Sequence, residues 1–381
     1  MKTKLTVIAM AMIALLLLSG CGQQQVTAKT SEEVNGKISI GAIFPLTGDA
    51  SQYGVEFQKI TDITIEEINA QGGINGKTLE VIYEDGKCNP KDASTAAQKL
   101  VNVDNVKLIL GGACSGESLG AAPITEANKV IIISPSATSP DLSDAGDFVF
   151  RTTPSDAFAG KVAAETAMKL GFKKAAILSE NTDYAQGLTK VFSQVFKELG
   201  GEVAAKENFD SDTTDVKTQI LKIKAAKPDV VYLAPQTPAK GALALKQLEE
   251  AGIEEQVIMD VVMIRGLLSD FPINIDGVIG IEAKFDENGE KAKALFEKYN
   301  ERHGKPTFGF YDAATYDAIH LLAEGLSKFG EDTEKIRDFL YSYEGKGAIG
   351  DLKFNEYGDA VVEFSVLEVK DSKLVPMEAE E

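Results

Sequence analysis

Two loops rich in small and hydroxyl-bearing residues are the part of this chain best suited to chemistry. Each follows a short apolar run that predicts a buried strand: GGACSGES follows residues 108–110, and SPSATSPD follows residues 130–133. In an open parallel sheet such loops lie together at the carboxyl ends of neighbouring strands, where ligands bind. Ser115, Ser136 and Thr138 supply hydroxyl donors, and the helix predicted after the first loop begins near Ser115. We expect a cradle for a small anionic group, a carboxylate in particular.

The first of these loops also offers an alternative chemistry. Residues 112–116, GACSG, have the G-x-C-x-G pattern of a nucleophile elbow, in which a strained turn exposes the nucleophile. A thiol nucleophile needs a base, normally histidine. The two histidines of the chain are His303, in a polar stretch, and His320, in a predicted helix, where a core or surface position is usual. We therefore expect that the protein is not an enzyme, and a hydrolase that uses Cys114 as its nucleophile remains an alternative.

Other chemical signatures are missing from the sequence. Neither a G-x-x-x-x-G-K-[ST] phosphate loop nor a G-x-G-x-x-G after the first predicted strand occurs, and no Cys and His spacing is typical of a metal site. We therefore expect neither a cofactor nor a metal. The formal net charge of −19 also argues against nucleic acid as a partner, because its phosphates would be repelled.

The first 36 residues are interpreted as an export and anchoring segment. Lys2 and Lys4 precede an apolar run over residues 5–18, and the following Leu-Ser-Gly-Cys resembles the bacterial lipobox, in which the cysteine, here Cys21, becomes the lipidated amino terminus. The alternatives are an ordinary signal peptide or a membrane-spanning helix, for which the apolar run is short. Residues 22–36 are polar and lack periodicity, which indicates a flexible tether. We expect an extracytoplasmic, lipid-anchored protein.

Export changes the interpretation of the two remaining cysteines. An oxidising compartment favours a disulfide between Cys88 and Cys114, and the alternative is a pair of buried free thiols. The disulfide would join the loop EDGKCNPKD to the first of the two hydroxyl-rich loops.

Strand and helix patterns alternate along the chain in two successive runs, which predict two doubly wound α/β lobes. The second run includes a candidate strand over residues 255–262, EQVIMDVV. The elements of the last third are too few for a third domain and are expected to complete the two lobes. The predicted first lobe comprises residues 37–155 and 285–345, and the second comprises residues 156–284 and 346–381. A chain that crosses between lobes more than once would form a hinge and a cleft.

Four further side chains are candidates for the walls and floor of that cleft. Tyr53, Tyr184 and Tyr311 lie in predicted loops at strand ends, where a tyrosine either contacts a ligand or serves as a packing lid. Asp156 lies at the first expected crossover and could bond a ligand amine. Its alternative role is the N-cap of a helix that begins at Ala157.

Several motifs in order resemble those of the branched-chain amino acid binding proteins of ABC importers, which are type I periplasmic binding proteins. The resemblance covers nearly all of the chain from residue 37, and the motifs are IGAIFPLTGDASQYG, INAQGGINGKTLEVIYEDGKCNPKDA, GGACSG, SPSATSPDL, FRTTPSD and NTDYAQG. It implies two α/β lobes joined by three hinge strands that close on an amino acid. It also implies a monomer that works with permease and ATPase subunits. A sensory module that uses the same cleft for signalling remains an alternative.

The resemblance also implies roles for individual residues. The ligand contacts that it implies are Tyr53, Ser115, Ser136, Ala137, Thr138, Asp156 and Tyr184. Ser115 and the loop over residues 136–138 would bind the ligand carboxylate, Asp156 would help to hold the α-amine, and the tyrosines would flank the ligand. The family's loop disulfide falls on Cys88 and Cys114.

The second lobe departs from the family pattern at two places. Gln236 stands where the family has a tyrosine, and Val262 or Met263 stands where a glutamate caps the ligand amine. A missing carboxylate weakens the case for an amine, because a buried ammonium needs paired acceptors. Arg265 could instead face an anionic ligand, or it could face solvent. The sequence thus predicts an intact carboxylate subsite and leaves the amine subsite open.

Overall fold

The computed structural model describes residues 36–271 and 273–377. The predicted signal segment, Cys21 and all of the predicted tether except Gly36 lie outside the described residues. No helix within the described ranges combines the length and the apolar character needed to cross a membrane.

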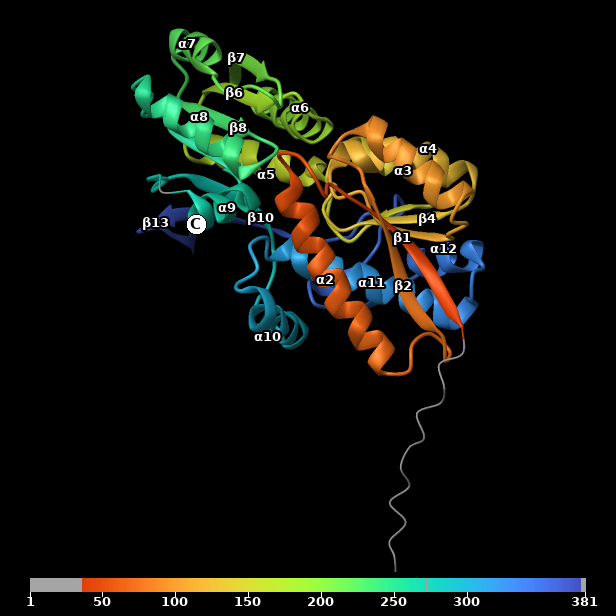
Figure 1. Cartoon of the computed structure of the whole chain (residues 1–381). Coiled ribbons are helices and arrows are strands. Elements are labelled where there is room, and N and C mark those ends of the chain that lie inside the picture. Colours follow the sequence, from red (N-terminus) through yellow and green to blue (C-terminus); the bar gives the residue numbers. More distant parts are fainter. Residues whose placement is uncertain (1–35, 272, 378–381) are drawn as a thin grey trace, which may run out of the picture.

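The first lobe is built on a five-stranded parallel sheet with the strand order β2-β1-β3-β4-β5. These strands are β1 (Lys37–Phe44), β2 (Thr78–Asp85), β3 (Leu108–Gly111), β4 (Ile131–Ser134) and β5 (Val149–Arg151). The sequences LILG of β3 and IIIS of β4 are buried along their whole length, as expected for parallel strands covered on both faces. The helices α3 (Pro90–Asn102) and α4 (Ser115–Ala127) cover one face (Figure 1).

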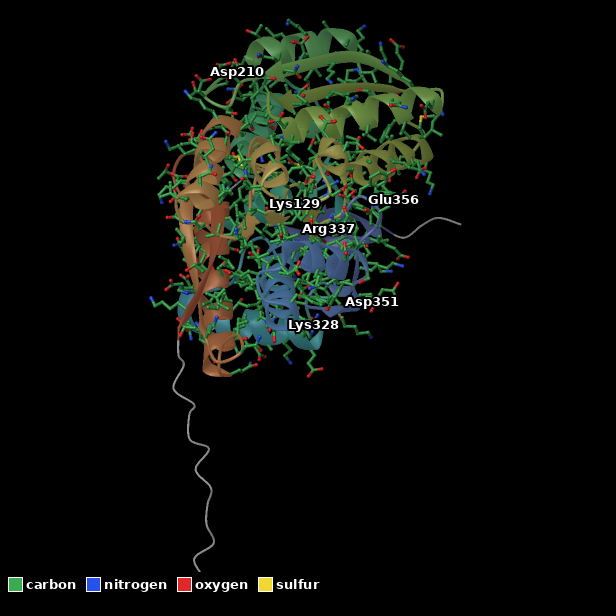
Figure 2. All side chains as sticks on the ribbon, turned by 90° about the vertical axis from the view of Figure 1, so that its right-hand side faces the viewer. Lys129, Asp210, Lys328, Arg337, Asp351 and Glu356 are labelled. Atoms are coloured by element: carbon green, nitrogen blue, oxygen red, sulfur yellow. A yellow bond between two sulfur atoms is a disulfide. The ribbon has the colours of Figure 1, made fainter. Side chains whose placement is uncertain are left out.

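The other face of this sheet is covered by helices from both ends of the chain. They are α2 (Ser51–Ala70), α11 (Phe310–Phe329) and α12 (Thr333–Tyr341), and α10 (Glu290–His303) packs beside α2 (Figure 1). In the rotated view of Figure 2, Lys129 lies near the α12 residue Arg337, and Lys129 forms an ion pair with Glu334 of the same helix. The late helices therefore return to the first lobe, where they complete its core.

The second lobe contains a seven-stranded mixed sheet with the order β14-β13-β10-β9-β8-β6-β7. Its strands are β6 (Lys174–Glu180), β7 (Glu202–Phe209), β8 (Val230–Ala234), β9 (Gln256–Asp260), β10 (Ile279–Ala283), β13 (Phe364–Lys370) and β14 (Lys373–Pro376). The helices that flank this sheet are α5 (Asp156–Lys169), α6 (Asp183–Glu198), α7 (Lys217–Ala226), α8 (Pro238–Glu250) and α9 (Val261–Asp270). The strand order reverses around β1 in the first sheet and around β6 in the second. Such switch points are where open α/β sheets bind ligands.

Within the described residues, the chain crosses between the lobes three times, in the segments 152–155, 284–289 and 354–363. The crossings lie side by side. Arg151 and Asp359 form a parallel bridge, and the backbone N–H of Lys284 donates to the carbonyl of Glu363 at 2.6 Å. The predicted two-lobe α/β fold with a three-segment hinge is confirmed.

The structure corrects the place where the chain last enters the second lobe. The prediction assigned all residues from 346 onward to that lobe. The hairpin of β11 (Glu344–Gly347) and β12 (Gly350–Lys353) instead remains with the first lobe, because the carboxylate of Asp317 in α11 accepts the backbone N–H groups of Ala348 and Ile349 at 2.6 and 2.9 Å. The chain rejoins the second sheet at β13.

A second correction concerns the end of β9. The sequence predicts a strand over residues 255–262, but β9 ends at Asp260 and α9 begins at Val261. The cause is local, because the side chain of Asp260 accepts the N–H of Val262 at 2.7 Å and caps the helix. This turn directs Asp260 toward the space between the lobes.

Candidate ligand-binding site

Two adjoining voids lie between the lobes at the carboxyl ends of the central strands, and both are lined by Thr138 and Tyr311. The residues predicted from the sequence that line the first void are Tyr53, Ser115, Ser136, Thr138, Tyr184, Gln236 and Tyr311. Asp156 lines the second void. Ala137 is buried, and its carbonyl accepts a hydrogen bond from Arg151 at 3.3 Å. The structure thus gathers the predicted residues in one region, and their contact with a ligand stays a prediction.

The two hydroxyl-rich loops are joined to each other by Ser115. Helix α4 begins at this residue, where the sequence analysis expects a helix amino terminus. The Ser115 Oγ accepts the backbone N–H groups of Thr138 and Ser139 at 3.2 and 3.1 Å, which leaves its own hydroxyl hydrogen free to donate. The Ser136 hydroxyl, by contrast, donates to the carbonyl of Ala113 at 2.7 Å. The loops are therefore held in place by some of the hydroxyls that were expected to face a ligand.

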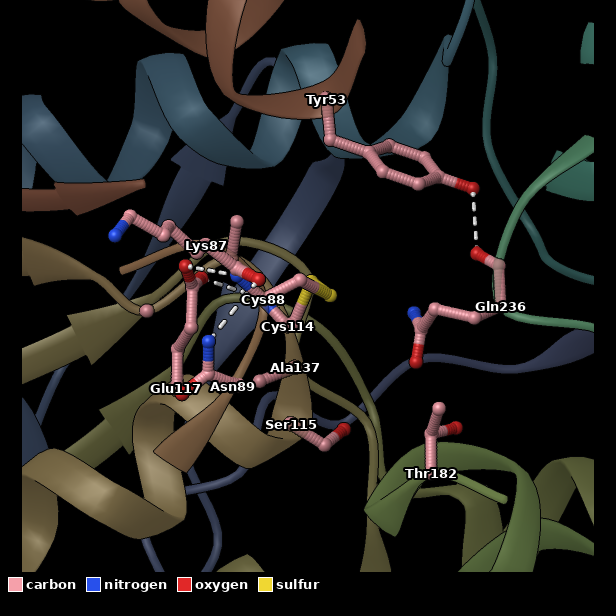
Figure 3. Close-up of a disulfide and its surroundings, with 12 residues drawn as sticks. Tyr53, Lys87, Cys88, Asn89, Cys114, Ser115, Glu117, Ala137, Thr182 and Gln236 are labelled. Atoms are coloured by element: carbon pink, nitrogen blue, oxygen red, sulfur yellow. Dashed lines mark hydrogen bonds between the residues drawn. A yellow bond between two sulfur atoms is a disulfide. The ribbon is translucent and has the colours of Figure 1, made fainter. Parts of the chain in front are cut away.

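A disulfide between Cys88 and Cys114 fixes the loop before α4, as predicted (Figure 3). The carboxylate of Glu117 lies beside it and accepts the backbone N–H groups of Cys88 and Cys114, both at 3.0 Å. Burial raises the pKa of Glu117 to about 8. The hydrolase alternative requires a free thiol at Cys114, and in this structure that sulfur is bonded to Cys88.

The three tyrosines lie in the first turns of helices, not in loops as predicted. Tyr53 lies in the first turn of α2, Tyr184 in the first turn of α6, and Tyr311 in the first turn of α11. The hydroxyl of Tyr53 crosses between the lobes and donates to the carbonyl of Gln236 at 3.2 Å (Figure 3). The hydroxyl of Tyr184 is buried and has no hydrogen-bond partner within the described part of the chain.

Three acidic side chains, Asp156, Asp260 and Glu282, line the second void, and the first two come from residues at helix starts. Asp156 is the first residue of α5, and Ser155 is the N-cap, with its Oγ accepting the N–H of Ala157 at 3.3 Å. The carboxylate of Asp156 instead accepts the Thr138 hydroxyl at 2.7 Å. Burial raises the pKa of Asp156 to about 7. The pKa of Asp260 is raised to about 8, first by burial and then by the charge of Asp156. In the part of the chain that the structure describes, neither carboxylate has an ion-pair partner.

Asp260 was not among the predicted site residues. Met263 lines the first void and Val262 the second, so the expected hydrophobic replacements are present, but Asp260 lies directly before them and supplies a carboxylate. Its position at a strand end, before a run with helical character, is an N-cap signal that could have found it.

Arg265, which was expected to face either an anionic ligand or solvent, is instead paired within the protein, and its side chain is 25% exposed. Its guanidinium forms a bidentate ion pair with Glu282, with Nε–Oε1 at 2.8 Å and Nη2–Oε2 at 3.1 Å. The pairing neutralises Glu282, which also lines the second void. The positive charge of Arg265 is thus satisfied within the protein. No cluster of three or more potential metal ligands occurs in residues 36–271 and 273–377.

The lobes are in contact across the cleft. Asp49 and Lys240 approach each other to 3.6 Å from opposite lobes, and Gly187 of α6 lies so close to Pro140 that an added Cβ would be 2.8 Å from the Pro140 Cδ. The structure therefore shows a closed arrangement.

A family model described as periplasmic binding protein matches residues 37–373. The chain belongs to this family. A leucine-, isoleucine-, valine-, threonine- and alanine-binding protein of Pseudomonas aeruginosa is 31% identical over 332 residues, which cover 84% of this chain and 87% of that protein. The motif resemblance to branched-chain amino acid binding proteins is confirmed.

Solved structures of the family have the same fold. A leucine-binding protein from Thermotoga maritima superposes with a TM-score of 0.82 at 27% identity, covering 90% of this chain and 98% of that one. A solute-binding protein of an ABC transporter from Rhodopseudomonas palustris, in complex with 3,4-dihydroxybenzoic acid, superposes with a TM-score of 0.79 at 24% identity, covering 90% and 96%. At this lower identity the second similarity concerns the fold alone.

Proposed function

We propose that this protein captures an α-amino acid between its lobes and delivers it to an ABC importer. The observation that carries the proposal is the pair of carboxylates, Asp156 and Asp260, that face one void beside the hydroxyl-rich loops. The names of the Pseudomonas and Thermotoga relatives, which bind amino acids, support it.

The carboxylate of the ligand would bind at the start of α4. The first backbone N–H groups of a helix have no acceptor within the helix, and the helix dipole favours a negative charge there. The free hydroxyl hydrogen of Ser115 adds a donor at the same place. Thr138 and Ser136 shape the opposite side of this subsite.

The amine of the ligand would bind between Asp156 and Asp260. Burial of the two carboxylates disfavours their charged forms and raises both pKa values, and the charge of Asp156 raises the pKa of Asp260 further. A ligand ammonium between them supplies the missing counter-charge and favours the ionised form of both. A carboxylic acid without an amine offers no such compensation, so the geometry favours an amino acid.

Ligand binding would stabilise closure because the ligand contacts both lobes. Ser115 and Thr138 belong to the first lobe, whereas Asp260, Tyr184 and Gln236 belong to the second. A ligand that bridges the two sets stabilises the closed state relative to the open state. We further propose that the mature protein is a monomer anchored by lipid at Cys21 on the outer side of a membrane. The lipobox pattern and the disulfide, which suits an oxidising compartment, support this placement.

The test is a thermal-shift and calorimetric comparison of amino acids with matching carboxylic acids that lack the amine. A ligand at a hundred times its dissociation constant stabilises the folded state by about 2.7 kcal/mol, which gives a clear shift. Asp260→Asn keeps the cap on α9 but removes the charge, and Asp260→Ala removes both. We expect Asp260→Asn to lose amino acid binding while it retains the melting temperature of the ligand-free protein. Equal binding of the amine-free acids would refute the amine subsite, and undiminished affinity in a Ser115→Ala, Thr138→Ala double variant would refute the carboxylate subsite.

A further inference from the structure

The amide of Gln236 is a polar group in the cleft that neither proposed subsite uses. The residue follows β8 and is held by its backbone: its N–H donates to the Glu180 Oε2 at 2.7 Å, and its carbonyl accepts the Tyr53 hydroxyl at 3.2 Å. The side chain is therefore attached at a fixed point of the cleft. Figure 3 shows the amide directed from the second lobe toward Cys114 and Ser115.

This amide forms no hydrogen bond with any other described residue, although it lines the first void. A second group in the same void is in a similar state, because the hydroxyl of Tyr184 is without a partner and the residue is only 5% exposed. Buried polar groups are normally hydrogen-bonded, and a buried group left unpaired destabilises the state that contains it. The buried Tyr184 hydroxyl and the half-buried Gln236 amide, both lining one void, therefore indicate a polar occupant.

We infer that the amino acid ligand has a neutral polar side chain that ends in a hydroxyl or a carboxamide. This inference rests on the proposed function, which assigns the ligand carboxylate to α4 and the amine to Asp156 and Asp260. The part of the ligand that remains to meet Gln236 and Tyr184 is then its side chain. An amide offers both a donor and an acceptor, and a hydroxyl does too, so the complementary group is one that also offers both.

The surroundings disfavour an acidic side chain. The carboxylate of Glu180 lies next to the backbone of Gln236, and Asp156 and Asp260 lie in the adjoining void, so a further negative charge would be repelled. An aliphatic side chain would leave the amide and the hydroxyl unpaired on closure. A site built to hydrogen-bond a polar group discriminates strongly against the analogue that lacks it.

The experiment compares pairs of amino acids with matched shapes, using calorimetry on the purified protein: threonine with valine, asparagine with leucine, and glutamine with methionine. We expect at least one polar member to bind ten times or more as tightly as its apolar counterpart. In Gln236→Met, which keeps the side-chain length, this preference should fall at least tenfold. Tyr184→Phe should reduce it to a lesser extent.

Alanine serves as the control ligand, because it carries the amine and carboxylate without a polar side chain. Its affinity should fall by less in Gln236→Met than the affinity of the preferred polar amino acid does, and the melting temperatures of the two ligand-free proteins should agree. Tighter or equal binding of valine, leucine and methionine would overturn the inference while leaving the proposed function intact. Tightest binding of lysine or arginine would overturn it in the same way. If no amino acid binds at all, both the inference and the proposed function are wrong.

Discussion

The hydroxyl of Thr138 donates a hydrogen bond of 2.7 Å to the carboxylate of Asp156, and both residues are almost completely buried. Thr138 belongs to the second hydroxyl-rich loop, and Asp156 begins the first helix after the chain crosses to the other lobe. The backbone N–H of Asp156 also donates to the carbonyl of Thr138 at 2.8 Å. The loop proposed to face the ligand carboxylate and the acid proposed to face the amine are thus one hydrogen-bonded unit at the hinge.

Thr138→Val should weaken amino acid binding by about tenfold or more, because it keeps the shape of the side chain but removes a buried bond to a charged group, which is worth about 1.5–3 kcal/mol. The hydrogen bond from Thr138 lowers the pKa of Asp156, so its loss also disfavours the ionised form that an ammonium requires. Titration calorimetry measures the change. Thr64→Val, which removes a buried hydroxyl bond within α2, is the matched control and should leave affinity unchanged. Equal affinities in all three proteins would contradict the role of Thr138.

The ligand-free protein should lose stability as the pH rises toward 8. Asp156 and Asp260 have pKa values raised to about 7 and about 8, whereas unfolded carboxyl groups titrate near about 4. The folded state therefore holds more protons between these values, and the stability from these groups is complete below about pH 4 and is lost as the pH rises through about 7 to 8. A ligand ammonium reverses the cost of ionisation, so an amino acid should stabilise the protein more at pH 8 than at pH 5.

Thermal unfolding at several pH values, with and without ligand, measures this effect. Glu117 and Asp317 also have raised pKa values, at about 8 and about 6, and they contribute a pH dependence of the same sign. The matched control is therefore the Asp156→Asn, Asp260→Asn double variant, whose ligand-free melting temperature should fall less between pH 5 and pH 8. An identical fall in both proteins would show that the two acids are not responsible.

The sequence predicted the first-lobe half of the site because its signals are local. An apolar run followed by small and hydroxyl-bearing residues marks a strand end, and the switch-point rule then brings Ser115 and Thr138 together without any knowledge of long-range contacts. The position of Tyr53 was also predicted, although its place in the first turn of α2 was not.

The second-lobe half could be predicted less well because it depends on pairings that local periodicity does not encode. The apolar run through residues 255–262 favoured a continuous strand, and the cap formed by Asp260 ended it. The sequence did not decide whether Arg265 faces a ligand or solvent, because its ion-pair partner, Glu282, lies on the neighbouring strand β10. In the same way Asp317 holds the hairpin near Ala348 in the first lobe, across 31 residues of sequence.

Removal of the disulfide should destabilise the protein without unfolding it. Cys88 and Cys114 are 26 residues apart, and closing a loop of this length contributes about 3.5 kcal/mol in the chain-entropy model. The Cys88→Ser, Cys114→Ser double variant should therefore show a lower midpoint in denaturant and weaker ligand binding, because the start of α4 loses its attachment to the loop after β2. Thiol titration of the unreduced protein provides the complementary measurement. Labelling of Cys114 there would contradict the disulfide and revive the hydrolase alternative.

Substitution of Gly187 should block closure of the lobes while the fold of each lobe is retained. An added Cβ at this position of α6 would be 2.8 Å from the Pro140 Cδ and 2.9 Å from the Ser139 Oγ, and both of these residues belong to the opposite lobe. Gly187→Val should therefore lower ligand affinity at least tenfold and enlarge the radius of gyration measured by X-ray scattering with ligand present. Lys190→Val, at an exposed position of the same helix, carries the same β-branched side chain and should close normally. Because contact between α6 and the loop after β4 exists only when the lobes are together, tight binding by Gly187→Val would show that the ligand-bound state is more open than this structure.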